Sequence, residues 1–164
     1  MTDGAVVWFT GLPASGKTTL ATRVRAAIVD PCVLLDSDEV RDALGATGYS
    51  GTERDAFYHA LGGLAALLAR QGLLVLVAAT APRRAHRDHA RARAPRFVEV
   101  WVDAEPAECA ARDVKGLYAQ AHRGEAPHLP GVGAPYEPPV VPDVIASGGD
   151  DMSAVEAIVT RLQT

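Results

Sequence analysis

The chain has 164 residues, of which 48% are apolar and 22% charged, and its formal net charge at pH 7 is −4. This length favours one domain, 1–164, with a single core, and the composition is typical of a globular protein. The negative charge argues against a nucleic-acid partner bound through overall positive charge. The most apolar run, residues 73–79, is far below the about 20 residues that a membrane-spanning helix needs.

The cysteine content and the N-terminal residues help to predict the cellular compartment of the protein. Cys32 and Cys109 are too few for a disulfide framework and lack metal-ligand spacing, so we expect both to be buried packing residues. The N-terminus carries Asp3 and no basic segment before an apolar one, which argues against a secretory signal. We therefore expect a cytoplasmic protein.

A glycine-rich loop lies between two apolar segments. Residues 5–10 predict a buried strand, and residues 19–28 repeat an apolar side chain every four positions, as on one face of a helix. Between them, residues 11–18 match the phosphate-loop pattern G-x-x-x-x-G-K-[ST]. The alternative, a glycine-rich turn that matches by chance, is disfavoured by both flanks. The chain is therefore predicted to bind a nucleoside triphosphate.

Backbone N–H groups and a helix N-terminus surround the phosphates in such a loop. Lys17 is expected to reach the β- and γ-phosphates, and the Thr18 hydroxyl to coordinate magnesium. The nucleotide-binding residues predicted here are Gly11, Leu12, Pro13, Ala14, Ser15, Gly16, Lys17, Thr18 and Thr19.

Two carboxylates follow the second predicted strand, residues 32–35. Side chains alternate along a strand, so Asp36 and Asp38 should lean to the same side, at the sheet edge where ligands bind. They suit a magnesium ligand and a group that orients or deprotonates an attacking hydroxyl. Either one could instead cap the helix predicted to begin near Glu39. Arg41, three residues after Asp38, can face the same site.

The middle of the chain predicts a helix over residues 53–71, with Thr52 as its cap and Gly72 as its stop. Residues 73–79 are typical of a strand buried on both faces. Arg54 lies in the first helical turn, where a cation is unfavourable, so we expect either an anionic partner or a solvated arginine.

Residues 81–96 form the most basic stretch of the chain. It is compatible with phosphate or nucleic-acid binding, but charges along a helix more often form a solvated face, which we favour here. His86 and His89 lack metal-partner spacing and are expected at the surface.

The C-terminal part contains a candidate lid. Residues 97–102 predict a fourth strand and residues 105–112 a short helix. Between about 113 and 142, prolines and glycines exclude a packed helix or a central strand. A long irregular segment of this kind is typical of a lid, which in phosphoryl transfer excludes water. Residues 144–145 and 152–162 predict a last strand and a closing helix.

Strands that alternate with helices predict an α/β fold, with a mostly parallel five-stranded sheet, right-handed crossovers and helices on both faces. Within this order, segments over nearly the whole chain resemble the adenylylsulfate kinase family. They are residues 7–12, 35–41, 97–103, 112–118 and 134–139. The Lys-Gly-Leu-Tyr and Pro-Tyr-Glu segments are far more specific than the phosphate loop.

The resemblance implies a single-domain P-loop kinase with ATP and Mg²⁺ as cofactors and transfer of the γ-phosphoryl group to the 3′-hydroxyl of adenylyl sulfate. It places Asp38 at the accepting hydroxyl and Asp36 near magnesium beside Thr18, so Asp38, Lys17 and Asp36 are the candidate catalytic residues. Arg112 is assigned to the nucleotide. The acceptor-binding residues implied are Asp38, Arg41, Tyr49, Arg54, Phe57, Lys115 and Leu129.

Within that set, the resemblance places Arg41 and Arg54 at the phosphosulfate and ribose end of the acceptor. Tyr49 would stack on its adenine, and Lys115 would lie in the lid near the phosphates.

The departures from the family pattern cluster in the acceptor pocket. Phe57 stands where the family has asparagine, Ala81 where it has serine, and Leu129 where it has an aromatic residue. Two or three lost contacts of about 1–3 kcal/mol each would weaken acceptor binding by several powers of ten. Either the pocket compensates, with Tyr49 and Leu129 enclosing the adenine, or the acceptor is a different hydroxylated metabolite.

The expected partner is thus a small molecule with a hydroxyl group, without nucleic acid or membrane, and a homodimer is left open. An alternative of a different class is a nucleotide-binding module without turnover, or a polynucleotide-end kinase that uses residues 83–96. The acidic net charge argues against it.

Overall fold

The computed structural model describes residues 3–113 and 115–164. Met1, Thr2 and Val114, which fall within the predicted domain and lid, lie outside the described residues. The elements are β1 (Ala5–Thr10), α1 (Lys17–Ala27), β2 (Cys32–Asp36), α2 (Ser37–Leu44), α3 (Gly51–Ala69), β3 (Leu74–Ala78), α4 (Arg84–Arg91), β4 (Phe97–Val102), α5 (Pro106–Arg112), α6 (Leu117–His122), β5 (Val144–Ala146) and α7 (Met152–Gln163).

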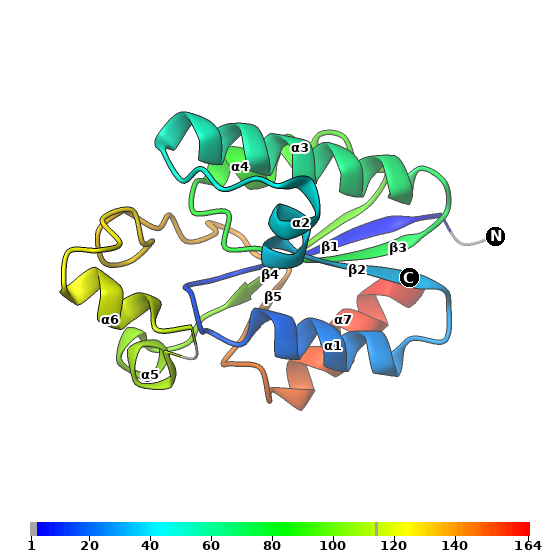
Figure 1. Cartoon of the computed structure of the whole chain (residues 1–164). Coiled ribbons are helices and arrows are strands. Elements are labelled where there is room, and N and C mark those ends of the chain that lie inside the picture. The colour runs from blue at the N-terminus through cyan, green and yellow to red at the C-terminus, as the bar shows by residue number, and fades with distance from the viewer. Residues whose placement is uncertain (1–2, 114) are drawn as a thin grey trace.

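The five strands form one parallel sheet in the order β2-β3-β1-β4-β5. Helices α3 and α4 cover one face, and α1 and α7 cover the other (Figure 1). The predicted α/β fold with five parallel strands is therefore confirmed. In such a sheet the carboxyl ends of the strands meet at one edge, which is where ligands bind.

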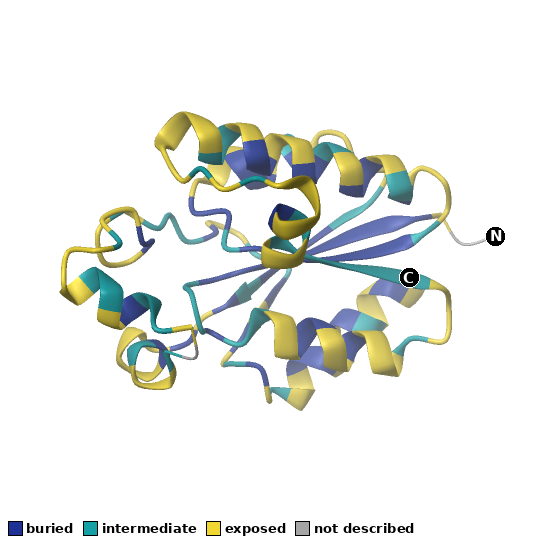
Figure 2. Ribbon diagram, viewed as in Figure 1, coloured by how far each residue is buried: buried dark blue, intermediate teal, exposed yellow. Residues whose placement is uncertain are grey.

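The central strand β1 divides the core into two clusters. Val7 and Phe9 point toward α1 and α7, whereas Val6 and Trp8 point toward α3 and α4. This alternation explains why β1 reads as continuously apolar: both faces of the strand are covered. Figure 2 shows β1 and β3 buried and the edge strand β2 only partly so.

Several helix ends differ from the predictions because of capping. Asp36 caps α2, which begins at Ser37 rather than near Glu39, and its side chain accepts a hydrogen bond from the Asp38 N–H. Ser50, not Thr52, caps α3, and a reciprocal bond from Ser50 N–H to Glu53 completes the capping box.

The lid region contains one element that its composition did not predict. Helix α6 occupies Leu117–His122, before the proline-rich part begins, so the expectation of wholly irregular structure was wrong there. Asp113 accepts hydrogen bonds from the N–H groups of Tyr118 and Ala119, which holds the first turn of this helix. The other described residues of this segment form turns and irregular chain, with one isolated bridge between Pro130 and Ala134.

Most arginines of the basic stretch are exposed, as a solvated face predicts, but two of its basic residues are buried. Arg87 is fully buried and His86 is 1% exposed, so the expectation of a surface position was wrong for His86, while His89 is only partly covered. His86 Nε2 lies 2.6 Å from Asp55 Oδ1, which provides a partner on α3.

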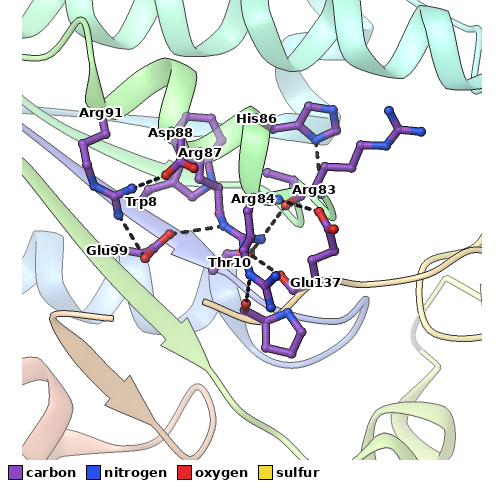
Figure 3. A network of polar contacts seen from close by, with 12 residues as sticks. Trp8, Thr10, Arg83, Arg84, His86, Arg87, Asp88, Arg91, Glu99 and Glu137 are labelled. Atoms are coloured by element: carbon purple, nitrogen blue, oxygen red, sulfur yellow. Dashed lines mark hydrogen bonds and ion pairs between the residues drawn. The ribbon is translucent and has the colours of Figure 1, made fainter. Parts of the chain in front are cut away.

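Arg87 is the centre of a polar network between α4, the sheet and the distal lid (Figure 3). Its Nε lies 3.2 Å from Glu99 of β4, and Nη1 and Nη2 donate to the carbonyls of Ala81 and Glu137. Nη1 also donates to the Thr10 hydroxyl, which lies 2.9 Å from that of Tyr136. Because Thr10 immediately precedes the glycine loop, this network fixes where that loop begins.

Other expectations concern the thiols and the membrane. Cys109 is buried, as expected, whereas Cys32 lies on the edge strand β2 and is only partly buried. Among the described residues, no helix is both long and apolar enough to cross a bilayer.

Candidate active site

The phosphate loop connects β1 to α1 in the strand-loop-helix order that its sequence predicts. Gly16 has a φ of 101°, in the left-handed region, and a Cβ there would lie 2.5 Å from the Gly149 nitrogen. A side chain is excluded at this position for both reasons. Helix α1 begins at Lys17, so its free N–H groups are directed at the loop.

The Lys17 side chain lies folded back on its own loop. Its Nζ donates to the carbonyls of Leu12 at 2.8 Å and Gly11 at 3.2 Å. The surrounding protein displaces water from the ammonium group and lowers the pKa of Lys17 to about 8. A phosphate would supply the negative charge that this lysine lacks.

Thr18 and Asp36 meet at the carboxyl ends of β1 and β2. The Thr18 hydroxyl donates to Asp36 Oδ2 at 2.5 Å. A hydroxyl and a carboxylate side by side at the mouth of a phosphate loop are the oxygen ligands that Mg²⁺ prefers. The described residues contain no cluster of three or more His, Cys, Asp or Glu suited to a metal. The donor set therefore fits an ion that takes its other ligands from phosphate and water.

Asp38 lies in the first turn of α2 and pairs with Lys115 from the lid. Both side chains are more than half exposed, at 55% and 60%. The pair connects α2 with the lid, so residues that are far apart in sequence, 38 and 115, lie side by side at the cavity.

A cavity of about 560 Å³ joins these parts, a size typical of small-molecule sites. Its lining comes from the phosphate loop, α2, α3 and the lid. The predicted residues that line it are Pro13, Ala14, Gly16, Lys17, Thr18, Thr19, Asp36, Asp38, Arg41, Tyr49, Arg54, Arg112, Lys115 and Leu129.

Arg41 lies in the cavity wall, 6% exposed. Its guanidinium carbon is 4.4 Å from the ring centroid of Tyr49 and 3.9 Å from that of Phe57, and Nη1 donates to the Gly48 carbonyl. No Asp or Glu among the described residues forms an ion pair with it. A charge buried in this way is costly unless a ligand compensates it.

Arg54 is the second cation of this wall. Its Nη1 donates to the His128 carbonyl of the lid at 2.8 Å. Burial lowers the pKa of the Arg54 guanidinium, and the neighbouring charge of Arg41 lowers it further. Arg54 therefore does not point into bulk solvent, and two cations converge on one part of the cavity.

The lid packs directly on the phosphate loop. The Tyr118 hydroxyl donates to the Pro13 carbonyl at 2.8 Å, and Leu129 joins Tyr118 in a small apolar cluster against Leu12 and Ala14. Burial by the same packing raises the pKa of the Tyr118 hydroxyl, which keeps it a hydrogen-bond donor.

Some predicted residues do not reach the cavity. Gly11, Leu12 and Ser15 lie behind the loop surface, and Phe57 is buried beneath Arg41 rather than exposed to a ligand. Ala81 is also buried. The sequence reasoning missed Tyr58, Thr80 and Gln120, which line the wall. Tyr58, adjacent to Phe57 on α3, could have been found from helical spacing to Arg54.

Comparisons with known proteins agree with this geometry. The adenylylsulphate kinase family profile matches residues 3–147. The chain belongs to this family. An adenylyl-sulfate kinase from Chloroflexus aurantiacus is 46% identical over 146 residues, which cover 87% of this chain and 78% of that protein. One from Synechococcus sp. (strain JA-3-3Ab) is 44% identical, with 87% and 83% covered.

Among solved structures, the Mycobacterium tuberculosis APS kinase CysC in complex with AMPPNP and APS superposes with a TM-score of 0.91. It is 35% identical, and the match covers 100% of each chain. The P-loop kinase fold of the adenylylsulphate kinase family is thus the fold of this chain.

Proposed function

We propose that this protein transfers the γ-phosphoryl group of ATP to the 3′-hydroxyl of adenylyl sulfate. The observation that carries the proposal is a cavity with a phosphate loop at one end and, at the other, two arginines that form no ion pair with any carboxylate among the described residues. Such a cavity fits two anionic ligands that meet between the two ends. The solved relative with AMPPNP and APS supports the same pairing of ligands.

On the nucleotide side, the loop N–H groups and the start of α1 hold the phosphates, and Lys17 turns from the Leu12 carbonyl to the β- and γ-phosphates. Thr18 and Asp36 would hold Mg²⁺, which supplies charge neutralisation between the β- and γ-phosphates when bound. Arg112, on the cavity wall and 43% exposed, would contact the nucleotide.

On the acceptor side, Arg41 and Arg54 would hold the phosphosulfate group. Tyr49 is half exposed, and the guanidinium carbons of Arg41 and Arg54 lie 4.4 Å and 5.9 Å from its ring centroid, so the adenine would stack on its exposed part. Leu129, at the inner surface of the lid, would enclose the base from the opposite side. Stacking of this kind is worth about 1–3 kcal/mol per base.

Asp38 would orient the accepting hydroxyl and take its proton during transfer. Lys115 forms an ion pair with this carboxylate. When the nucleotide is bound, the phosphates compete for Lys115, which leaves Asp38 free for the hydroxyl. Phosphoryl transfer needs positioning and charge stabilisation above all, and both residues serve these ends.

The segment 113–142 would act as a lid that excludes water, since it already packs on the phosphate loop and on Arg54. A cytoplasmic location and a homodimer stay predictions of the sequence.

A kinase for another hydroxylated metabolite is the second candidate, because Phe57, Ala81 and Leu129 contribute no polar side-chain group to the acceptor end. An apolar wall of this kind could accept a different organic group between the same two arginines.

The test is a coupled assay of ADP release with adenylyl sulfate as the acceptor. We expect saturable turnover in the wild type and none for Lys17→Ala, with thermal melting to show that the variant is folded. Folded protein that binds ATP but does not turn over at millimolar adenylyl sulfate would refute the proposal. A screen of hydroxyl-bearing metabolites with the same readout would then identify the acceptor.

A further inference from the structure

The position of Arg41 poses a physical problem. It is 6% exposed and carries a full charge, and no Asp or Glu in the described part of the chain pairs with it. Within the described part of the chain, its guanidinium donates from Nη1 to the Gly48 carbonyl, at 3.2 Å, and also approaches the Tyr58 hydroxyl. A long side chain with so few polar contacts needs other contacts to fix its orientation.

Aromatic rings provide those contacts, and they differ in rigidity. The guanidinium carbon lies 3.9 Å from the Phe57 ring centroid, 4.4 Å from that of Tyr49 and 6.0 Å from that of Tyr58. A guanidinium over a ring face is attracted by the ring quadrupole, more strongly when water is excluded. Phe57 therefore makes the shortest of these contacts.

Phe57 is also the fixed member of the pair. It is 6% exposed and packs in the core between α3 and the sheet, edge-on against Tyr58. Tyr49, in contrast, is 50% exposed and lies in the loop between α2 and α3. When Tyr49 turns to a ligand, the Phe57 ring remains under the guanidinium.

We propose that Phe57 is a positioning residue for the acceptor: it holds the Arg41 guanidinium toward the cavity, so that the anionic group of the acceptor meets a preorganised cation. Phe57 is not among the residues that line the cavity, so it acts through Arg41 and not by touching the ligand. Preorganisation of this kind raises affinity because less motion is lost on binding. The inference rests on the proposed function for the identity of the acceptor.

The test is a double-mutant cycle on Phe57 and Arg41, read out as the dissociation constant of adenylyl sulfate by calorimetry. Phe57→Leu keeps apolar bulk and removes the ring face, and Arg41→Gln removes the charge. We expect Phe57→Leu to weaken binding about tenfold in the wild type and at most about twofold in the Arg41→Gln background. Equal losses in both backgrounds would overturn the inference.

Leu61→Val is the matched control, because Leu61 lies one turn further along α3, is 1% exposed and belongs to the same core cluster as Phe57. It should lower the melting temperature and leave the affinity for adenylyl sulfate unchanged. ATP affinity should be unchanged in both variants. A loss of acceptor affinity in Leu61→Val as large as that in Phe57→Leu would reduce Phe57 to a general packing residue and overturn the proposal.

Phe57→Tyr covers the case in which Phe57→Leu does not fold, since it keeps the ring face. It should bind adenylyl sulfate within about twofold of the wild type. Full loss of affinity in folded Phe57→Tyr would count against the inference.

Inorganic sulfate, as a second probe, separates this inference from the proposed function. If the wild type binds no adenylyl sulfate but binds sulfate more tightly than Phe57→Leu, the proposed function fails and the positioning role stands. If adenylyl sulfate binds and Phe57→Leu changes neither affinity, the positioning role fails alone. Wild-type protein that binds neither ligand overturns both.

Discussion

Arg87 on α4 and Arg41 on α2 are both almost completely removed from solvent, but their surroundings differ. Arg87 lies 3.2 Å from Glu99 and donates to two carbonyls and a hydroxyl. Arg41 has one carbonyl, aromatic rings and a cavity. The first arginine has a carboxylate partner and three hydrogen-bond acceptors within the protein, whereas the second has no carboxylate partner among the described residues and lines the cavity.

The difference shows that a buried arginine can serve either the fold or the binding site, depending on whether the protein provides a carboxylate partner. A buried cation with a buried carboxylate holds segments of the fold together, here β4, α4 and the distal lid (Figure 3). A buried cation that lines a cavity and has no carboxylate partner is energetically costly, and an anion that binds beside it offsets that cost.

The largest expected effect is on Arg87. Replacing it by Met leaves Glu99, 4% exposed, with Arg91 alone, and leaves the Ala81 and Glu137 carbonyls without their donor. We expect the free energy of unfolding to fall by about 3–5 kcal/mol, the cost of breaking a buried ion pair. Urea denaturation measures it, and an unchanged midpoint would show that Arg87 is not structural.

Replacement of Arg41 should affect acceptor binding strongly and stability little, the opposite of the effect expected at Arg87. Arg41→Gln removes an uncompensated buried charge, so the unfolding midpoint should stay the same or rise. The affinity for adenylyl sulfate should fall about a hundredfold, since a charge-assisted hydrogen bond contributes about 1.5–3 kcal/mol. Calorimetry and urea denaturation on the same preparation check both halves, and a stability loss comparable to that of Arg87→Met would abolish the distinction.

The sequence predicts much of the fold, but of the two arginines it predicts only the position of Arg41 at the site and not the burial of Arg87. The five strands and the phosphate loop follow from local patterns, because strand, loop and helix are adjacent in the chain. The burial of Arg87 does not, since its partners Glu99 and Glu137 are 12 and 50 residues away and no local pattern connects them. The sequence feature that could have indicated a buried cation is Glu99, a charged residue within an otherwise apolar strand.

The same limit applies to the site. Asp36, Asp38 and Arg41 follow one another closely in sequence, and the resemblance to a family predicts that they lie near the acceptor and magnesium. The structure places all three in the lining of one cavity. That Phe57 supports Arg41 from below, and that α6 begins before the proline-rich part of the lid, depend on packing between elements far apart in sequence.

Lys17 is a third cation of the cavity and, unlike the two arginines, it can lose its proton near neutral pH. Burial lowers its pKa to about 8, and bound phosphate should raise that pKa. At pH 8.5 the free protein is then partly deprotonated at Lys17, so nucleotide binding should take up a fraction of a proton, whereas at pH 6.5 uptake should approach zero. Calorimetry in buffers of different ionisation enthalpy measures it.

In that experiment Arg41→Gln is the control, since it leaves the phosphate loop intact and should preserve the proton uptake at pH 8.5. Uptake that is the same at both pH values would contradict the assignment of the shifted pKa to Lys17.

The smallest effect is expected for Lys115, which has a carboxylate partner but is exposed. Lys115→Ala breaks its pair with Asp38, and because both side chains are more than half in solvent, stability should change by less than about 0.5 kcal/mol. The rate of phosphoryl transfer should fall if Lys115 moves to the phosphates. Stability loss above 1 kcal/mol in urea denaturation, a value at the top of the usual range for exposed pairs, would contradict this view.

The most direct test of the central claim is phosphorus NMR of the reaction of ATP with adenylyl sulfate. We expect a new phosphomonoester resonance, coupled to the 3′ proton of the acceptor ribose, that grows in step with ADP. Formation of ADP with inorganic phosphate alone, or no reaction by protein that binds both ligands, would contradict the account.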